Sequence, residues 1–357
     1  MTWRRNLGQP GVAAALGAAL LFGAGTPLAK RLLQGVGPWM LAGLLYFGSG
    51  LGLLLLRRLR RAAPVRLPPG QWRWLAGAVL AGGVVGPVLL MFGLTRMPAS
   101  GASLLLNAEG VFTALLAWFA FRENFDKRIA LGMAAIVAGA VVLGWPAGST
   151  GGAPMGSVWP ALAVLGACLA WAIDNNLTRK VSLNDAMWIA SVKGLVAGAV
   201  NLVLAVVVGS DLPAWPAVAA AMTLGFFAYG ISLTLFVVSL RHLGTARTGA
   251  YFSVAPFFGA LLAVVWLGER VDPTLLAAGA LMSVGVWLHL SEQHLHEHAH
   301  EPMEHEHEHE HDAHHQHEHE HEHLPGMAGI KHAHLHRHTS LAHRHDHFPD
   351  EHHRHTH

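Results

Sequence analysis

Ten apolar runs follow one another from the start of the chain to residue 291, and they constrain the fold more than any other feature. A helix of about 20 apolar residues crosses the hydrocarbon core of a bilayer, which is about 30 Å thick. None of the runs alternates with a period of two, so they predict helices and not the strands of a barrel. The runs cover 11–30, 37–56, 74–94, 99–121, 129–146, 158–178, 186–208, 215–239, 247–267 and 273–291.

The composition agrees with an integral membrane protein. Of the 357 residues, 52% are hydrophobic and only 13% are charged, whereas a soluble domain carries about 25% charged residues. The single cysteine, Cys168, excludes an intrachain disulfide and a thiolate metal site. The first run follows Arg4 and Arg5 as in a signal peptide, but it continues into "TPLAKRLL". We therefore interpret it as a membrane span.

Lysine and arginine are shared unevenly between the two sides of the predicted bundle. With the N-terminus in the cytoplasm, the other side holds Lys30, Arg31, Arg96 and Arg270. The cytoplasmic side then holds Arg4, Arg5, Arg57, Arg58, Arg60, Arg61, Arg66, Arg73, Arg122, Lys127, Arg128, Arg179, Lys180, Arg241 and Arg247. Positive residues gather on the cytoplasmic side of membrane proteins, and an even number of spans brings the C-terminus back to that side. Both termini are therefore expected in the cytoplasm.

The two halves of the membrane region repeat each other. The stretch "AEGVFTALLAWFAFREN" (108–124) aligns with "VAPFFGALLAVVWLGER" (254–270) at an offset of 146. Upstream, "GAALLFGAGTPLAK" (17–30) aligns with "GACLAWAIDNNLTR" (166–179) at an offset of 149. Five helices per copy is an odd number, so the second copy is expected to enter the membrane inverted. Inverted repeats are typical of secondary transporters, whose substrate site lies near the midplane between the halves.

The repeated pattern resembles a known family. An apolar helix with "F..ALLA...LGE", a polar turn and a Gly-rich helix resembles the EamA repeat of the drug/metabolite transporter superfamily. Residues 255–270 match well, whereas the first copy departs at Glu109, Gly110 and Arg122. The resemblance implies an all-α integral membrane protein that exports a small solute through ten helices in two inverted five-helix repeats. We expect a first repeat at 1–147, a second at 157–291, and a disordered His-rich cytoplasmic tail at 292–357.

Two carboxylates inside the predicted spans are candidates for a solute site. Glu109 stands in "LLLNAEGVF" beside Asn107, and its counterpart in the second copy is Ala255, so the fold does not require an acid there. Asp174 opens the polar triplet with Asn175 and Asn176. Charged groups at such depth are costly and usually face a partner or a cavity, and carboxylate with amide oxygens suits a cation. The alternatives are a structural carboxylate at Glu109 and snorkelling at Asp174.

Lys193 lies two turns into the seventh span, at about the depth of Asp174, so an ion pair between them is expected. The pair could be structural, or an arriving cation could compete with the lysine for the carboxylate. Asn201 falls within about 80° of Lys193 around the helix axis and extends the polar stripe. Glu123 and Glu269 are expected to cap or pair at span ends, and His242 and His289 are not assigned a role.

The end of the chain differs sharply from the membrane region. Of 27 histidines, 25 lie between His294 and His357, where acidic residues outnumber basic ones by 13 to 4. The segment has too few apolar residues to form a core. Imidazole with neighbouring carboxylate favours nickel, cobalt or zinc, and irregular spacing predicts several sites rather than one. The predicted ligands are His305, His307, His309, His311, His314, His315, His317, His319, His321, His323, His343, His345, His347, His352, His353, His355 and His357.

These features together predict an inner-membrane exporter of a divalent transition metal, nickel or cobalt first, driven by proton exchange. The chain resembles the metal-resistance members of the superfamily, which carry His-rich ends. Two alternatives stay open: a metabolite or amino-acid exporter whose tail buffers metal, and a membrane-anchored metal store or sensor. No Walker A stretch is present, and neither an enzymatic activity, a required cofactor nor a nucleic-acid partner is expected. A homodimer stays open.

Overall fold

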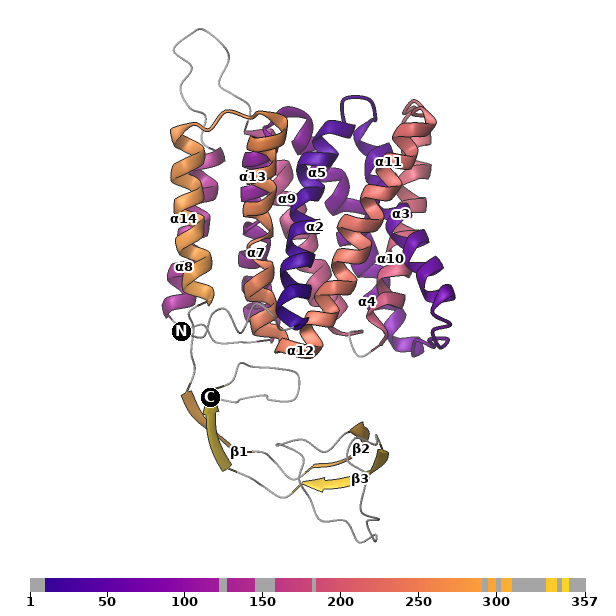
Figure 1. Ribbon diagram of the computed structural model, residues 1–357, viewed down its shortest axis with the longest axis vertical. Coiled ribbons are helices and arrows are strands. Elements are labelled where there is room, and N and C mark those ends of the chain that lie inside the picture. Colours follow the sequence, from indigo (N-terminus) through magenta and orange to yellow (C-terminus); the bar gives the residue numbers. More distant parts are fainter. Residues whose placement is uncertain are drawn as a thin grey trace. The chain divides into compact units, whose positions relative to one another are not determined.

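The computed structural model describes residues 10–121, 127–144, 158–181, 184–290, 295–299, 303–309, 332–338 and 342–346. It separates into two compact units, Met1–Glu292 and Gln293–His357. The first unit is a bundle of long, roughly aligned helices (Figure 1). Its first half contains α2 (Pro10–Leu32), α3 (Pro38–Leu59), η1 (Pro69–Gln71), α4 (Trp72–Ala78), η2 (Val79–Val85), α5 (Gly86–Arg96), α6 (Ala99–Leu105), α7 (Ala108–Phe121) and α8 (Lys127–Gly144).

The second half repeats this order. It contains α9 (Trp159–Arg179), α10 (Ala186–Val207), α11 (Trp215–Gly225), η3 (Phe226–Ile231), α12 (Ser232–Phe252), α13 (Ala255–Leu267) and α14 (Pro273–Leu290). Seven helical stretches of the described chain are long and apolar enough to cross a membrane, and three shorter apolar helices accompany them. The predicted runs fall on these helices except the ninth, 247–267. Helix α12 continues from Ser232 to Phe252, so the first part of this run extends the preceding helix, and the expected gap at 240–246 is helical.

The predicted spans are less regular than expected. The third and eighth runs each contain a π-helical turn, η2 and η3, and these turns correspond at the repeat offset of 146. The fourth run, expected as one helix over 99–121, breaks at Leu106 and Asn107 between α6 and α7. The prediction of uninterrupted helices is therefore wrong at these places. A π-turn frees backbone carbonyls from the helical ladder, and inside a membrane other groups must satisfy them.

Glycines bring α3 and α10 into backbone contact. A Cβ on Gly198 would lie 2.4 Å from the backbone nitrogen of Phe47, and a Cβ on Gly194 would lie 2.6 Å from that of Gly50. Apolar burial gives no drive for helices to associate in lipid, so close packing at small residues holds them together. The same contact fixes Lys193, one residue before Gly194, relative to the first half.

Replacing Gly198 by Ala is expected to force α3 and α10 apart and to lower the free energy of unfolding by about 1–3 kcal/mol. Thermal unfolding of the detergent-solubilised protein measures the change. Gly279→Ala is the matched control, because the nearest side-chain atom to its added Cβ is 3.6 Å away, at ordinary contact distance. Equal stability of the two variants would contradict the close-packing explanation.

A charged pair joins the end of α3 to the start of α10. The buried Arg57 guanidinium donates to the carboxylate of Asp185 and to the carbonyl oxygen of Ala63, the latter at 2.9 Å. Asp185 also caps α10, since its carboxylate accepts from the backbone N–H of Trp188 at 2.9 Å. Burial alone raises the pKa of Asp185, but the Trp188 N–H and Arg57 together hold it below its ordinary value.

The second unit contains four short strands, β1 (Leu295–Ala299), β2 (Met303–His309), β3 (His332–His338) and β4 (Ala342–Asp346). β1 pairs with β4 and β2 with β3, both antiparallel. That the segment 292–357 as a whole is disordered stays a prediction. The His–Glu alternation has the period of a strand, and it places His305 opposite His336 and His307 opposite His334.

Candidate functional site

Asp174 of α9 and Lys193 of α10 form an ion pair inside the bundle. The Lys193 ammonium lies 2.5 Å from Oδ1 and 2.6 Å from Oδ2 of Asp174, and 3.2 Å from Oγ1 of Thr178. The Thr178 hydroxyl in turn donates to Oδ1 at 2.8 Å. Residues four apart share one helix face, so α9 presents three oxygens to the ammonium. The predicted ion pair is confirmed, and Asp174, 7% exposed, does not snorkel.

The π-helical turn η2 packs directly against Asp174, one member of this pair. A Cβ on Gly82 would lie 2.0 Å from Oδ2 of Asp174, so only glycine leaves room for the carboxylate. The Gly82 carbonyl accepts hydrogen bonds from the Tyr46 hydroxyl and the Trp171 indole N–H, each at 2.9 Å. Side chains from α3 and α9 thus satisfy a carbonyl in the π-turn and fix the turn beside Asp174.

Glu109 lies in the first turn of α7, directly after the break in the fourth span. Its Oε1 accepts a hydrogen bond from the Asn175 amide at 2.9 Å. The neighbouring Asn176 amide donates to the carbonyl oxygens of Ala172 at 2.9 Å and Thr113 at 3.3 Å. Consecutive residues on α9 therefore face different partners: Asp174 faces α10 and η2, while Asn175 and Asn176 face α7.

The two carboxylates belong to one electrostatic group. Glu109 interacts with both Asp174 and Lys193 through space, in addition to its hydrogen bond from Asn175. With all three groups ionised, the group carries one net negative charge inside the membrane region. No cluster of three or more His, Cys, Asp or Glu side chains occurs in the described chain. A metal ion here would therefore need amide, hydroxyl or carbonyl oxygens beside the carboxylates.

Two other predicted site residues donate to backbone carbonyls. Asn107 donates to the carbonyl oxygen of Leu104 at 2.9 Å and approaches the sulfur of Met282 at 3.9 Å, so it packs toward α14 and satisfies the helix break. Asn201 donates to the carbonyl oxygen of Gly83 at 3.1 Å, which ties α10 to η2. Its amide thus satisfies a carbonyl in the π-turn, while its buried Oδ1 has no hydrogen-bond partner in the described chain, and its place in the solute site stays a prediction.

The residues that complete the site were missed by sequence reasoning. Thr178 gave a signal, because it follows Asp174 at the spacing of one helix face. The sequence marks Gly82 only as one of two adjacent glycines, which can have several meanings. It does not mark Tyr46 or Trp171, because the Gly82 carbonyl that both side chains bind becomes available only in the π-turn.

The remaining predictions concern the glutamates and histidines at the span ends and the histidines of the tail. The Glu269 carboxylate accepts from the backbone N–H groups of Ala99 at 2.7 Å and Ser100 at 2.8 Å, which confirms that it caps a helix. Its counterpart Glu123 lies outside the described residues, as do the side chains of His242 and His289. The side chains of all the predicted tail ligands also lie outside them.

Comparison with known proteins agrees with this architecture. The chain is 27% identical over 286 residues to an "Uncharacterized transporter" of Methanothermobacter thermautotrophicus, covering 76% of this chain and 83% of that one. It is 25% identical over 246 residues to the "Uncharacterized inner membrane transporter YedA" of Escherichia coli K12, covering 66% and 76%. It is 30% identical over 204 residues to a "Probable terminal-alkyne amino-acid exporter" of Streptantibioticus cattleyicolor, covering 56% and 67%.

A solved protein structure has the same fold, with a TM-score of 0.59 at 22% identity over 77% of this chain and 95% of the other. The model of the EamA-like transporter family matches twice, at residues 9–145 and 158–291, and thus covers both halves and most of the chain. These two matches follow the internal repeat of the sequence. The protein is therefore a multi-pass membrane transporter that belongs to the EamA-like transporter family.

Proposed function

We propose that this transporter exports a divalent transition-metal cation from the cytoplasm, nickel or cobalt first, in exchange for protons. The observation that carries the proposal is the group formed by Glu109, Asp174 and Lys193, which places two carboxyl groups on the neighbouring helices α7 and α9 beside one ammonium. Ionisable groups at this depth mark ion pathways in membrane proteins. The Asn175 amide and the Thr178 hydroxyl stand beside the carboxylates.

Lys193 keeps the site closed to cations until the substrate arrives. Its ammonium occupies the three oxygens of Asp174 and Thr178, which are also the oxygens that a metal ion would use. A divalent cation that enters between Glu109 and Asp174 displaces the ammonium, and a proton on Glu109 leaves as the metal binds. Reprotonation of Glu109 and return of Lys193 release the metal on the other side. The site is weak because each ligand has an alternative partner, and a transport site must release what it binds.

The tail supports this proposal from its own chemistry. It alternates imidazole and carboxylate, ligands that suit nickel, cobalt and zinc. With both termini in the cytoplasm, the tail raises the local concentration of metal or senses its load. We propose that it binds several ions and that transport itself takes place in the helical bundle, formed by the two repeats at 1–147 and 157–291.

A second function is favoured by a different observation. The three oxygens of Asp174 and Thr178 already hold a primary ammonium group, that of Lys193. The ammonium of an amino acid could take its place, and one relative is named an amino-acid exporter. In that case the tail would only buffer metal.

The first test compares metal content in cells expressing the full chain, Glu109→Gln, Asp174→Asn and a truncation after Gln293. Both carboxylate variants are expected to lose export, so that cellular nickel or cobalt rises to the level of cells without the transporter. The truncated chain is expected to keep export and to need more metal for half-maximal rate, because the tail concentrates the substrate.

Asp211→Asn is the matched control, because Asp211 is an exposed carboxylate in the loop before α11. Membrane abundance of each variant is measured on the same cells. Full export by Glu109→Gln and Asp174→Asn would contradict the proposed site. Unchanged metal content in every strain, with amino-acid export present, would instead support the second function.

A further inference from the structure

The turn between α5 and α6 is held by two charged side chains from different halves of the bundle. The ammonium of Lys30, at the end of α2, donates to the carbonyl oxygens of Leu94 and Met97, the latter at 3.0 Å. The carboxylate of Glu269, beyond α13, accepts from the N–H groups of Ala99 and Ser100. The C-terminal end of one helix therefore binds a cation and the N-terminal end of the next binds an anion, as the helix dipoles favour.

Glycine at the end of α13 directs Glu269 to this turn. Gly268 has φ 67° and ψ 27°, a left-handed conformation that other residues rarely adopt, and it ends the helix. The chain then leaves the axis of α13, and the next side chain reaches α6. The "LGE" pattern thus has a physical meaning: glycine ends the helix and glutamate caps a helix of the other half.

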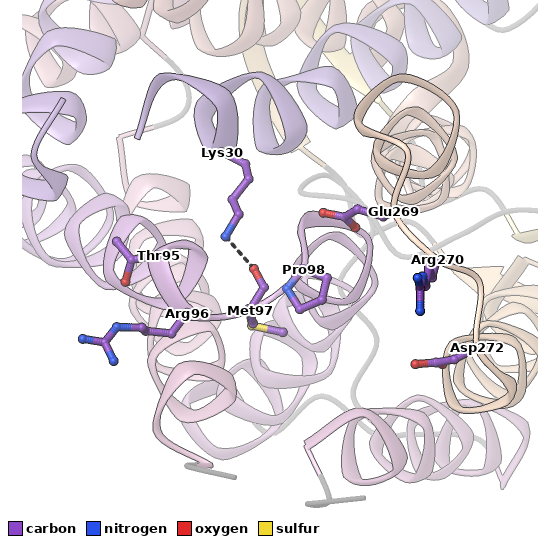
Figure 2. Close-up of a pocket in the computed structure, with 8 residues that line it drawn as sticks. All are labelled: Lys30, Thr95, Arg96, Met97, Pro98, Glu269, Arg270 and Asp272. Atoms are coloured by element: carbon purple, nitrogen blue, oxygen red, sulfur yellow. Dashed lines mark hydrogen bonds between the residues drawn. The ribbon is translucent and has the colours of Figure 1, made fainter. Parts of the chain in front are cut away.

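An open cavity of about 450 Å³ lies at the same turn. Figure 2 shows Lys30 bound to Met97 on one side of Pro98 and Glu269 on the other side. The residues that line the cavity are Lys30, Thr95, Arg96, Met97, Pro98, Glu269, Arg270 and Asp272. Glu109 and Asp174 are not among them, so the cavity ends before the candidate site. The distribution of Lys and Arg predicts that this end of the bundle faces away from the cytoplasm.

The two halves differ in backbone at this point. At the repeat offset of 146, Met97 and Pro98 correspond to Leu243 and Gly244. The first half turns there, whereas the helix α12 continues through the equivalent positions to Phe252. Transporters built from two related halves alternate access by moving one half against the other. The turn therefore gives the first half a backbone shape at this end of the bundle that the second half lacks.

We propose that Lys30 and Glu269 are positioning residues that latch the α5–α6 turn to both halves and keep this end of the bundle closed. Each contact joins a charged group to a helix end. Water satisfies both partners when the contact opens, so the latch can break without leaving a buried unpaired group. Opening would separate Glu269 of the second half from α6 of the first and extend the cavity toward Glu109.

Cysteine labelling of the full-length protein in sealed membranes tests the latch. Ser103 lies one turn beyond Ser100 on α6 and is 1% exposed, so Ser103→Cys reports opening to a membrane-impermeant maleimide added from the outer side. The native Cys168 is buried, and the chain without the added cysteine gives the background. Removing the charged hydrogen bonds with Glu269→Gln or Lys30→Met is expected to speed labelling by about tenfold or more.

Asp272→Asn is the matched control, because Asp272 lines the same cavity but its side-chain contact within the described residues is to its own helix α14, through the N–H of Leu275. It is expected to leave labelling unchanged. The proposal would be overturned if Ser103→Cys were labelled at the same rate alone and in combination with Glu269→Gln or Lys30→Met. Equal acceleration by Asp272→Asn would overturn it as well, since general loosening would then explain the effect. The assay uses no substrate, so its outcome is independent of the solute that the protein exports.

Discussion

Replacing Lys193 by Met is expected to abolish export and to lower the free energy of unfolding by about 3–5 kcal/mol, because it leaves Asp174 as a buried unpaired carboxylate. Asp174 is 7% exposed and its two oxygens both face the ammonium. Replacing Asp174 by Asn leaves the opposite charge unpaired, so a similar loss is expected. Thermal unfolding in detergent and solute efflux from proteoliposomes measure the two properties separately.

The double variant Asp174→Asn with Lys193→Met separates structure from transport. Neutral residues of similar volume remove both buried charges at once, and such replacements are often neutral for stability. We therefore expect stability close to that of the natural chain while export stays absent. A coupling of several kcal/mol in the double-mutant cycle would confirm that the two residues act on each other. Recovery of export together with stability would contradict a transport role and would assign the pair to folding alone.

The same variants distinguish the two proposed substrates. Without its ammonium, the Lys193→Met protein offers Asp174 and Thr178 to any cation. A metal substrate is then expected to bind more tightly but to leave slowly, so equilibrium binding of nickel to the purified protein truncated after Gln293, which lacks the His-rich tail, rises while efflux falls. If an amino acid binds more tightly and nickel does not, the amino-acid function is favoured.

The sequence was sufficient to predict the membrane helices and the ion pair. Helical spans were predictable because the bilayer imposes a length and an apolar composition that few other structures share. The Asp174–Lys193 pair was predictable because an unpaired charge inside the membrane is costly, and two opposite charges at equal depth lower this cost by pairing with each other. The capping role of Glu269 followed from its place at the end of an apolar run.

The irregular helices were beyond sequence reasoning, and the site depends on them. The π-turn η2 is bonded by Tyr46 and Trp171, and Asn107 at the break before α7 approaches Met282, so contacts from helices distant in sequence accompany both irregular places. Local propensity does not encode such contacts. Asn107 and Asn201 were assigned to the solute site because polar residues in spans suggest function, yet they satisfy backbone groups at these irregular places. An amide near a helix break is as readily explained by the unsatisfied backbone that the break creates.

Replacing Gly82 by Ala is expected to reduce export by more than tenfold, because the new methyl group would lie 2.0 Å from Oδ2 of Asp174 and 2.5 Å from its Cβ. Contacts this short cannot persist, so either the carboxylate or the π-turn must move. The carboxylate is held by Lys193 and Thr178. The turn is held at the Gly82 carbonyl by Tyr46 and Trp171. Movement of either side therefore breaks contacts that position the ion pair.

Gly17→Ala is the matched control, because the nearest atom to its added Cβ, Cδ1 of Leu235, is 3.5 Å away. It is expected to keep full export. A defect in Gly82→Ala has two explanations: the methyl group displaces the Asp174 carboxylate, or it breaks the π-turn. The stability of Gly82→Ala combined with Asp174→Gly separates them. The cost of Gly82→Ala is therefore measured twice, in the natural chain and in the Asp174→Gly background, where the side chain that collides with the methyl group is absent. In that background the cost is expected to fall below the about 1–3 kcal/mol of overpacking. If the cost is the same in both backgrounds, the methyl group acts by breaking the π-turn itself, and the turn rather than the carboxylate is what requires glycine.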